Sequence, residues 1–316
     1  MPFRDRRKRA FEQTFVLPRT FLRTWRNAFQ PRGGRRSRWT SWVGTNWARV
    51  TYARHVEPTW LELTRHEITI ADLPPAFAGM RIVQLSDLHA GRHVPVSFLT
   101  EAVHLANDQG ADIIALTGDF VHAGYRHVDR IARIVGKLHA RHGVYAVLGN
   151  HDYSVRNALG WRRYPRLPET IAAALNGQGI RVLRNEAVTV RRGDDEFHLV
   201  GVDDLWSRVC DVPRAFAGLP ATAPRVLLAH NPRTVAHLHD HRCDLVLSGH
   251  THGGQVNWPG LGRILLTRKN RMLAAGMYHY RNVRLYVNRG VGFGFRFRFN
   301  ARPEIAVFHL ERPRSD

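Results

Sequence analysis

The chain has 316 residues, 44% of them apolar, which is the composition of an ordinary globular protein able to bury a full core. Its 47 Lys and Arg against 26 Asp and Glu give a formal charge of +21. This charge favours an anionic partner but does not choose among nucleic acid, acidic lipid and a phosphorylated metabolite. Cys210 and Cys243 are too few for a disulfide framework and lack zinc-ribbon spacing, so we expect structural thiols.

The first 60 residues form a basic, aromatic-rich N-terminal arm. They hold 14 Lys and Arg against 3 acids, and five of the eight tryptophans. Phe21, Trp25 and Phe29 recur every fourth residue with arginines between them, so a helix here would carry an aromatic stripe edged by cations. Such a helix suits an anionic membrane surface; packing on the folded domain and a disordered arm together form an alternative of about equal weight. The Gly-Gly-Arg-Arg sequence at 33–36 predicts a linker.

The sequence also bears on cellular location. No stretch approaches the roughly 18 consecutive apolar residues that a membrane-spanning helix needs. Arg6 and Arg7 resemble the start of a twin-arginine export signal, but Arg19, Arg23 and Arg26 interrupt the apolar segment that such a signal requires. We therefore expect a cytoplasmic protein without a transmembrane helix, held peripherally on the inner face of the membrane by its arm.

A folded α/β domain is predicted over residues 61–316, because apolar runs there end abruptly in polar residues, as buried strands do. In the first half these strands alternate with two segments of helical periodicity, Phe98–Leu105 and Val128–Leu138. The second half has few helical segments, so two stacked sheets fit better than one open sheet. The predicted strands are Arg81–Leu85, Asp112–Leu116, Val144–Leu148, Arg181–Leu183, Phe197–Val202, Arg225–Ala229, Leu245–Leu247, Val283–Asn288 and Glu304–Leu310.

Almost every predicted core strand ends in a cluster of polar residues, and such clusters converge at the carboxyl ends of strands in α/β folds. Asp87 and His89 are two residues apart, which in an extended segment would direct both side chains to the same side. Glycines before Asp119, Asn150 and His250 permit sharp turns at the ends of the predicted strands and close approach of the backbone to neighbouring segments. The clusters are Ser86–His89, Gly118–Asp119, Gly149–Asp152, His230–Asn231 and Ser248–His252.

The residue types in these clusters point to metal chemistry. Asp, Asn and His are ligands of Mn, Fe and Zn, and the absence of cysteine from these clusters argues against a structural zinc site. Two carboxylates only partly neutralise two divalent cations, so the site would keep a net positive charge. Such a charge suits the binding of an anionic phosphate ester. Cations about 4 Å apart can hold its oxygens and lower the pKa of a bound water toward about 7, so we expect hydroxide as the nucleophile.

In this order the clusters resemble the pattern of the calcineurin-like metallophosphoesterase superfamily: Asp-x-His, Gly-Asp, Gly-Asn-His-Asp or Glu, a lone His, and Gly-His-x-His. The resemblance runs from about Glu57 to Leu310 and is most specific at Leu148–Asp152 and Ser248–Gln255. It implies a four-layer α-β-β-α sandwich of two mixed sheets. It also implies a metal-dependent phosphoester hydrolase with two divalent ions, of which Mn is the expected ion and Fe, Zn and Mg are alternatives.

Carried over position by position, the resemblance assigns seven metal ligands, with Asp119 shared between the two ions. One ion would be held by Asp87, His89, Asp119 and His252, and the other by Asp119, Asn150, His230 and His250.

Other residues near the clusters receive different roles. His151, held by Asp152, resembles the family's non-ligand histidine, which protonates the leaving oxygen or stabilises charge on the phosphoryl group; a structural neighbour is the alternative. We expect His122 to be a supporting residue, and Asp203 with Asp204 to form a turn rather than a ligand pair. Arg298 is a candidate for substrate phosphate contact, with an exposed arginine as the alternative.

Within the superfamily the chain resembles the bacterial UDP-2,3-diacylglucosamine hydrolase-like branch, given Ser248–Gln255 and Pro303–Ile305. That resemblance implies cleavage of a pyrophosphate or phosphodiester in a lipid-linked substrate. Aromatic residues alternate with Gly and Arg from Phe293 to Phe299, so a strand there would have one aromatic face for acyl chains; ordinary core packing is the favoured alternative. Arg296 departs from the proline expected at its position.

Two other functional classes remain open at this point. A nuclease or nucleotide phosphodiesterase would use the same chemistry on a polyanion, but much of the charge lies in the arm and no nucleic-acid-binding module accompanies it. A non-catalytic scaffold is disfavoured because no member of the ligand set is missing. We infer no protein partner.

Overall fold

The computed structural model describes residues 35–155, 163–220, 222–239 and 241–313, apart from the side chains of residues 35–42, 268 and 269. The aromatic stripe predicted at residues 21–29 lies outside the described residues. Contacts divide the chain into two compact units, Met1–Val50 and Thr51–Asp316.

The first described element is helix α2 (Arg35–His55). The linker predicted at 33–36 is therefore wrong for Arg35 and Arg36, which begin this helix. Over its 21 residues the helix has no proline and one glycine, Gly44, so nothing in its sequence stops helix formation. None of the helices in the described part of the chain is long and apolar enough to cross a membrane.

The first of two six-stranded sheets consists of β1 (Glu62–Thr69), β2 (Arg81–Leu85), β3 (Ile113–Thr117), β4 (Val144–Val147), β5 (Arg181–Val182) and β14 (Glu304–Glu311). The strand order is β1-β14-β2-β3-β4-β5. Strands β2 to β5 are parallel, whereas β14 runs antiparallel to β2 and parallel to β1. The carboxyl ends of β2, β3 and β4 therefore lie at one edge.

The second sheet consists of β6 (Glu186–Arg192), β7 (Asp195–Gly201), β8 (Arg225–Leu228), β9 (Leu245–Ser248), β12 (Gly276–Tyr280) and β13 (Val283–Val287). The order is β12-β13-β9-β8-β7-β6, with the four central strands parallel and both edge strands antiparallel. A small hairpin, β10 (Asn257–Trp258) and β11 (Gly262–Arg263), stands apart from both sheets.

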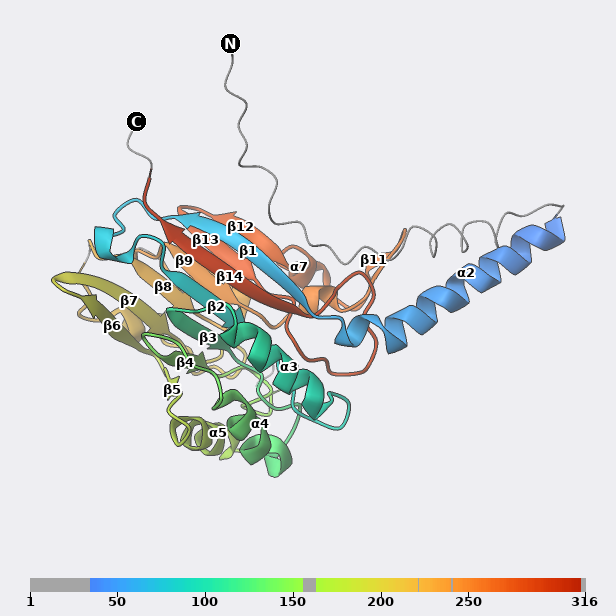
Figure 1. Cartoon of the computed structure of the whole chain (residues 1–316), viewed down its shortest axis with the longest axis horizontal. Coiled ribbons are helices and arrows are strands. Elements are labelled where there is room, and N and C mark those ends of the chain that lie inside the picture. The colour runs from blue at the N-terminus through green and yellow to red at the C-terminus, as the bar shows by residue number, and fades with distance from the viewer. Residues whose placement is uncertain (1–34, 156–162, 221, 240, 314–316) are drawn as a thin grey trace, which may run out of the picture. The chain divides into compact units, whose positions relative to one another are not determined.

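Helices cover the outer faces of both sheets. Helices α3 (Val96–Asn107), α4 (Val128–Val135) and α5 (Leu167–Asn176) pack on the first sheet (Figure 1). Helix α6 (Val212–Phe216) and the 3₁₀ helix η4 (Pro232–His237) pack on the second. The shorter helices are η1 (Glu57–Thr59), η2 (Pro75–Phe77), η3 (Tyr125–His127), η5 (His252–Gly254) and α7 (Arg268–Arg271).

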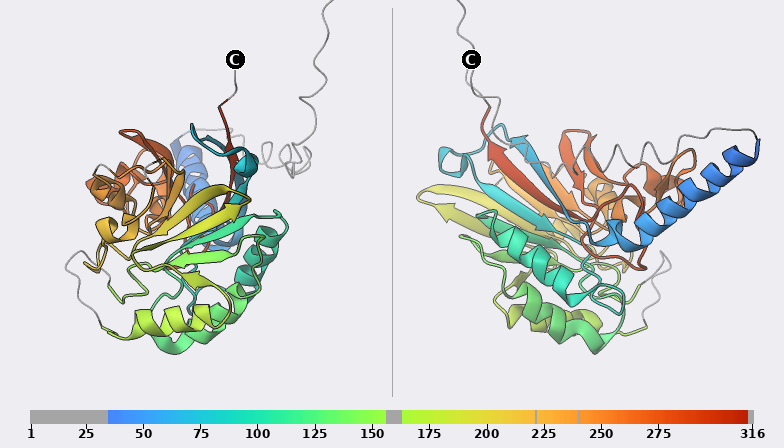
Figure 2. Two further views of the ribbon diagram at one scale, coloured as in Figure 1. Left: turned by 90° about the vertical axis from the view of Figure 1, so that its left-hand side faces the viewer. Right: turned by 45° about the vertical axis from the view of Figure 1, so that its right-hand side comes forward.

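The sheets pack face to face, which makes the predicted α-β-β-α sandwich (Figure 2). Residue alternation along the strands builds this arrangement, because successive side chains in a strand point to opposite faces. In β3, Ile113 and Ala115 join the core between the sheets, while Ile114 and Leu116 join the core under the helices. Both strand faces are therefore apolar, and this is why the central strands are readable as continuous apolar runs.

All nine predicted strands are present, with ends that differ by at most two residues. The strands that the sequence did not reveal include β1, β6 and β12, which lie at sheet edges. Their side chains are largely exposed or half-buried, so they lack the apolar runs on which the other predictions depended.

The aromatic strand considered at Phe293–Phe299 is wrong, because this segment is an irregular loop. Phe293 and Phe299 are buried, whereas Phe295 is 48% exposed, so the phenylalanines do not share one face. The loop wraps closely around the end of β2: a Cβ at Gly292 would overlap the carbonyl of Leu88.

A buried carboxylate ties the two sheets together. Glu304, the first residue of β14, accepts hydrogen bonds from the hydroxyls of Thr64 on β1 and Tyr286 on β13, at 2.8 and 2.6 Å. Its other oxygen accepts from the backbone N and Nε of Arg289, at 2.9 and 3.2 Å. Burial opposes ionisation of Glu304, but Arg289 and these hydrogen bonds outweigh it and lower the pKa of the carboxyl.

We predict that Glu304→Gln lowers the free energy of unfolding at neutral pH by about 3 kcal/mol, because it leaves the charge of Arg289 without its buried partner. A lowered folded-state pKa contributes stability above the unfolded pKa and loses it as pH falls through the folded one. The difference between wild type and variant should therefore shrink as pH falls below the ordinary Glu range, which urea denaturation at several pH values would measure.

The matched control is Glu186→Gln, at the first residue of β6. Glu186 pairs with Arg181 at 3.5 Å, but both side chains are about half exposed, so the loss should stay below about 1 kcal/mol. Equal losses for the two variants would contradict the assigned role of Glu304.

Candidate active site

The five polar clusters predicted from the sequence converge at the carboxyl ends of β2, β3, β4, β8 and β9. Their contacts join both sheets: Gly249 N donates to His230 O at 3.0 Å, and His250 N donates to both carboxylate oxygens of Asp87 at 3.0 and 3.1 Å. All seven predicted ligands are buried except His250 and His252, which are partly exposed. The structure thus brings together every residue that the sequence nominated as a ligand.

A first group of ligand atoms gathers around His89 and His252. The Nε2 atoms of these rings lie 2.9 Å apart, and His252 Nε2 is 3.3 Å from Asp87 Oδ1. His89 Nε2 is also 3.5 Å from Asp119 Oδ2. Two imidazole nitrogens and two carboxylate oxygens therefore face one small volume.

A second group lies on the other side of Asp119. His230 Nε2 is 3.3 Å from Asp119 Oδ2, the same oxygen that faces His89. His250 Nδ1 lies 2.8 Å from Asn150 Oδ1 and 3.3 Å from His230 Nε2. Asp119 is therefore shared between the two groups, as the resemblance implied.

Hydrogen bonds behind the site fix which atoms face it. His230 Nδ1 donates to the Thr117 carbonyl at 2.7 Å, which leaves Nε2 as the lone-pair atom. The Asn150 amide donates through Nδ2 to Val155 O at 2.6 Å, which turns Oδ1 toward His250. Ser86 Oγ donates to Asp87 Oδ2 at 2.6 Å. The motifs predicted the ligands, whereas Thr117, Val155 and the Ser86 contact were found only in the structure.

The backbone at the site is unusual. Asp87, His89, Asp119, His250 and His252 all have positive φ, between 46° and 75°. Such conformations are costly for residues other than glycine and persist where the surroundings enforce them, commonly at functional sites. The extended geometry expected for Asp87 and His89 is therefore wrong: left-handed turns, not strand alternation, direct their side chains.

Two glycines make room for the carboxylates. A Cβ at Gly149 would overlap Asp119 Oδ1, and a Cβ at Gly249 would overlap Ser86 Oγ and Asp87 Oδ2. The close backbone approach predicted from the Gly-Asn and Gly-His pairs is confirmed at these positions.

The electrostatics of the site fit divalent cations. Burial raises the pKa of Asp87 to about 6, and the charge of Asp119 adds to this effect. For His230, burial favours the neutral ring, but the charge of Asp119 and its hydrogen bond outweigh burial and raise the pKa to about 10. Both shifts show that buried negative charge here favours a compensating positive charge, which a proton can supply. Divalent ions held by carboxylate, amide and imidazole donors would supply that positive charge instead.

The predicted relation between His151 and Asp152 requires a correction. His151 Nδ1 donates to the backbone carbonyl of His122 at 2.8 Å, so His122 rather than Asp152 holds the ring. The Asp152 carboxylate instead accepts from the amides of Gly149 and Asp119, at 2.9 and 2.8 Å, and of Phe120 at 2.9 Å. Asp152 therefore shapes the loops that carry Asp119 and Asn150.

Arg298 is also placed differently from the prediction. Its guanidinium is fully buried and donates to backbone carbonyls, including Arg289 O at 3.0 Å and Ala301 O at 2.8 Å. Its Nη2 lies 3.3 Å from His252 Nδ1. The phosphate contact and the exposed alternative both fail, because the loop 289–301 folds around the side chain.

The aspartate pair and the two cysteines are placed as expected from the sequence. Asp204 accepts from Ser207 N and Oγ at 2.7 Å each, and Asp203 accepts from the Tyr153 hydroxyl at 2.6 Å, so they stabilise a turn and its surroundings. Cys210 and Cys243 are free thiols. The ring of Trp206 packs edge-on against His250, 4.4 Å between centroids, a contact for which the sequence carried no signal.

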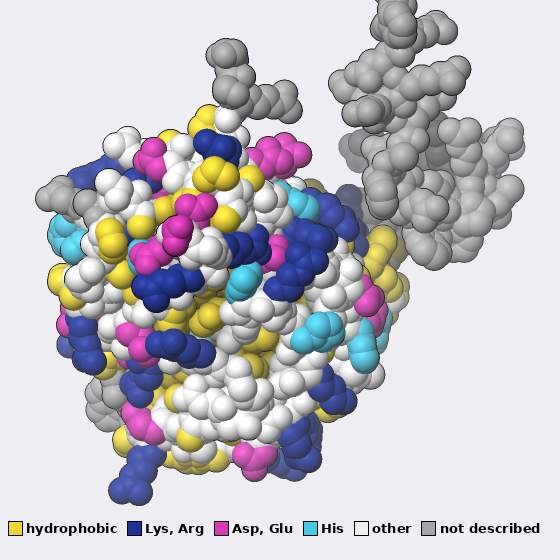
Figure 3. Space-filling model, turned by 60° about the vertical axis from the view of Figure 1, so that its left-hand side comes forward, with side chains coloured by type: hydrophobic (Ala, Val, Ile, Leu, Met, Phe, Trp, Pro, Cys, Tyr) yellow, Lys and Arg dark blue, Asp and Glu magenta, His cyan; other side chains and the backbone are white. Residues whose placement is uncertain are grey.

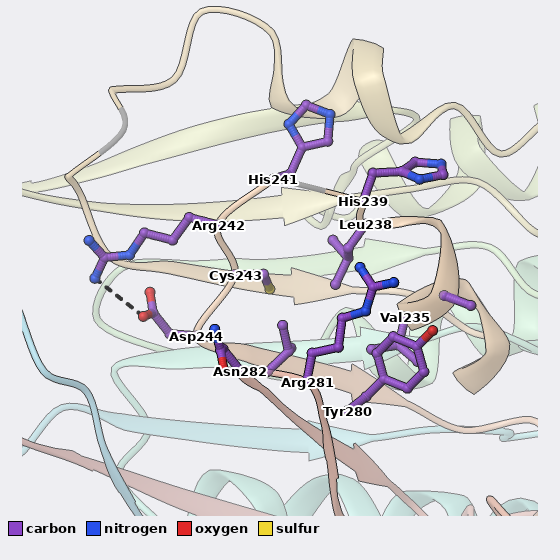
Figure 4. A pocket seen from close by; sticks show the side chains of 12 residues that line it. Val235, Leu238, His239, His241, Arg242, Cys243, Asp244, Tyr280, Arg281 and Asn282 are labelled. Carbon is purple, nitrogen blue, oxygen red and sulfur yellow. Dashed lines mark hydrogen bonds and ion pairs between the residues drawn. The ribbon is translucent and has the colours of Figure 1, made fainter.

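Two cavities differ in their relation to the site. One of about 160 Å³ lies beside His151 and is lined by His122, Ser154, Arg163 and Tyr164. The other, of about 490 Å³, lies at the amino ends of β9 and β13, the opposite ends from the ligand clusters (Figure 4). It is lined by residues that include His239 and Arg242, whose guanidinium pairs with Asp244 at 3.3 Å. Of these two cavities, the first is the one placed to take part in chemistry at the candidate metal ligands.

Comparison with known proteins decides the family. The model of the calcineurin-like phosphoesterases matches residues 80–254, a span that contains all five ligand clusters. The chain belongs to the calcineurin-like phosphoesterase family. It is therefore a metal-dependent phosphoester hydrolase, and the family and fold predicted from the sequence are confirmed.

Three relatives of this calcineurin-like phosphoesterase show how far the similarity extends. The phosphodiesterase YaeI of Escherichia coli is 34% identical over 82% of this chain and 92% of its own length. The UDP-2,3-diacylglucosamine pyrophosphatase LpxG of Chlamydia trachomatis is 32% identical over 81% of this chain and 91% of its own. YkuE of Bacillus subtilis, an uncharacterised metallophosphoesterase, is 32% identical over 82% and 89%.

We predict that His151→Ala lowers kcat about 10²–10⁴-fold while metal content stays unchanged, because the ring would transfer a proton without binding an ion. Steady-state kinetics on an aryl phosphodiester, with metal analysis of the same samples, would measure both. His139→Ala, which changes an exposed histidine, is the control. A loss of bound metal in His151→Ala would show that His151 is a ligand or a structural element and would contradict this role.

Proposed function

We propose that this phosphoesterase hydrolyses a pyrophosphate or phosphodiester bond in a lipid-linked substrate. An example of such a substrate is an acylated sugar linked to a nucleoside diphosphate. The observation that carries the proposal is the pair of ligand groups that share Asp119 Oδ2. The relatives support the substrate class, since LpxG is described as a UDP-2,3-diacylglucosamine pyrophosphatase and YaeI as a phosphodiesterase.

Seven side chains would hold two divalent ions, with Mn proposed and Fe, Zn and Mg as alternatives. Bound there, the ions would supply Lewis acidity toward the phosphoryl oxygens and activate water. The protein's part is to fix the donors: Thr117 O orients His230, Val155 O orients Asn150, and Ser86 orients Asp87.

His151 would serve the leaving group. Because Nδ1 donates to His122 O, Nε2 is the ring atom that can exchange a proton with the departing oxygen. The cavity beside it, lined by Tyr164 and Arg163, would receive part of the leaving group, since an aromatic ring and a guanidinium suit a polar anionic moiety. Arg163 lies over the Tyr164 ring at 5.5 Å.

A lipid-linked substrate implies work at a membrane surface. The charge of +11 in the first 60 residues supports peripheral attachment to an anionic leaflet, because each Lys or Arg near such a surface contributes about 1 kcal/mol. On the face shown in Figure 3, Lys and Arg side chains lie among acidic side chains. This mixed charge does not favour a nucleic-acid-binding surface on that face.

The proposal predicts a substrate ranking. With Mn, the enzyme should cleave a UDP-linked acylated sugar at least tenfold more efficiently, by kcat/KM, than a non-lipid nucleotide sugar or single-stranded DNA, because acyl chains add binding energy in the transition state. Phosphorus NMR of the products identifies the bond that breaks.

Asp119→Asn should be inactive on every substrate and thereby excludes contaminating hydrolases. Preferential cleavage of DNA, with steep salt dependence, would instead support a nuclease. A metal-loaded enzyme inert toward all three substrates would overturn the proposed lipid-linked and phosphodiester functions together.

A further inference from the structure

The segment from Asn257 to Leu273, which contains β10, β11 and α7, exposes a concentration of apolar side chains. Leu261, Ile264, Leu265 and Met272 are 65%, 46%, 51% and 75% exposed. Large hydrophobic residues that stand singly on a surface need no explanation, but four within so short a segment mark an interaction surface. No element in the described part of the chain buries these four side chains.

The positive charge of this 257–273 segment indicates an anionic partner. It contains Arg263, Arg268, Lys269 and Arg271 and no acidic residue. Leucine, isoleucine and methionine interleaved with cations are typical of surfaces that enter the interface of an anionic bilayer, where apolar groups reach the acyl boundary and cations meet phosphate headgroups.

The base of the segment packs on the loop that carries the metal ligands. Arg263 Nε donates to the carbonyl of Gly253, the residue after His252, at 3.3 Å. The stem of Arg263 lies so close that a Cβ at Gly254 would be 2.9 Å from Arg263 Cβ. Trp258 packs against Phe299, with 4.8 Å between ring centroids. The segment therefore has a fixed connection to the active site.

An exposed aromatic side chain, Phe295, lies close to the same turn. Gln255 Nε2 donates to the carbonyls of Phe295 and Phe297, at 3.0 and 3.1 Å. Phe295 is 48% exposed. Apolar groups from the 257–273 segment and from the loop after β13 are thus attached to the same turn, residues 252–255.

We propose that the 257–273 segment is a membrane-docking surface, in which Leu261, Ile264, Leu265 and Met272 enter the interface of an anionic bilayer. Docking would hold the turn after His252 near the lipid surface, where a lipid-linked phosphoester lies. This docking surface deepens the proposed function. It rests on the proposed function in one respect, because a lipid-linked substrate is the reason for the active site to face the lipid. It is separate from attachment by the N-terminal arm, because it concerns residues of the larger compact unit.

The test uses the full chain and vesicles of phosphatidylcholine with or without phosphatidylglycerol. The triple variant Leu261→Ser, Leu265→Ser, Met272→Ser should bind the anionic vesicles about tenfold or more weakly than wild type in co-sedimentation. The control, Val96→Ser with Tyr280→Ser, removes two other exposed apolar side chains (44% and 37%), which lie on other elements, and should bind as wild type does. Both proteins keep the arm, so a difference reports on the segment.

Insertion has its own readout. An environment-sensitive fluorophore on Leu265→Cys should shift its emission to the blue on addition of anionic vesicles, whereas the same label on Tyr280→Cys should not. The two proteins share the native Cys210 and Cys243, so background labelling is matched. No shift at position 265, or equal binding by the triple variant and wild type, would overturn the proposal. Any membrane attachment would then be made by the N-terminal arm or through a protein partner.

The outcomes separate this inference from the proposed function. Hydrolysis of a soluble aryl phosphodiester should be unchanged in the triple variant, because the changed side chains are exposed and none of them is a candidate ligand. Docking with no phosphoesterase activity toward lipid-linked substrates would defeat the proposed substrate and keep the docking surface. Activity toward such substrates with no insertion at position 265 would defeat the docking surface alone.

Discussion

The site depends on one buried carboxylate held between two histidines. Asp119 Oδ2 faces His89 Nε2 and His230 Nε2, and Asp119 Oδ1 accepts from His151 N at 2.8 Å. Burial disfavours the charge, but His230 and His151 outweigh burial and lower the pKa of Asp119. A carboxylate in this position attracts cations on both of its sides. Because further donor atoms surround each side, the carboxylate is shared by two candidate ion sites.

Much of the surrounding structure serves this placement. Gly149 leaves room for the Asp119 carboxylate, and Asp152 binds the amides of the same turn although burial and the charge of Asp119 raise its pKa to about 8. Strain in the left-handed turns is offset by the stacked sheets, whose central strands deliver the turns to a common edge. Rigid strands with strained exits hold metal donors more closely than flexible loops would.

The sequence revealed the central strands and the seven candidate ligands because both signals are local: an apolar run followed at once by Asp, Asn or His. It failed where the deciding contact is distant in the chain. The ring of His151 is held by a carbonyl 29 residues away, and Arg298 is buried by a loop whose path depends on the end of β2. Edge strands such as β1, whose side chains are mostly exposed or half-buried, gave no apolar run to read.

The most direct test of the shared carboxylate is the number of divalent ions bound per chain, measured by plasma mass spectrometry after reconstitution with Mn and removal of excess metal. We expect about two ions per chain in the wild type and in the control Asp194→Asn, which changes an exposed residue, and a loss of ions from both sites in Asp119→Asn. Retention of two ions by Asp119→Asn, or binding of none by the wild type, would contradict the shared role of Asp119.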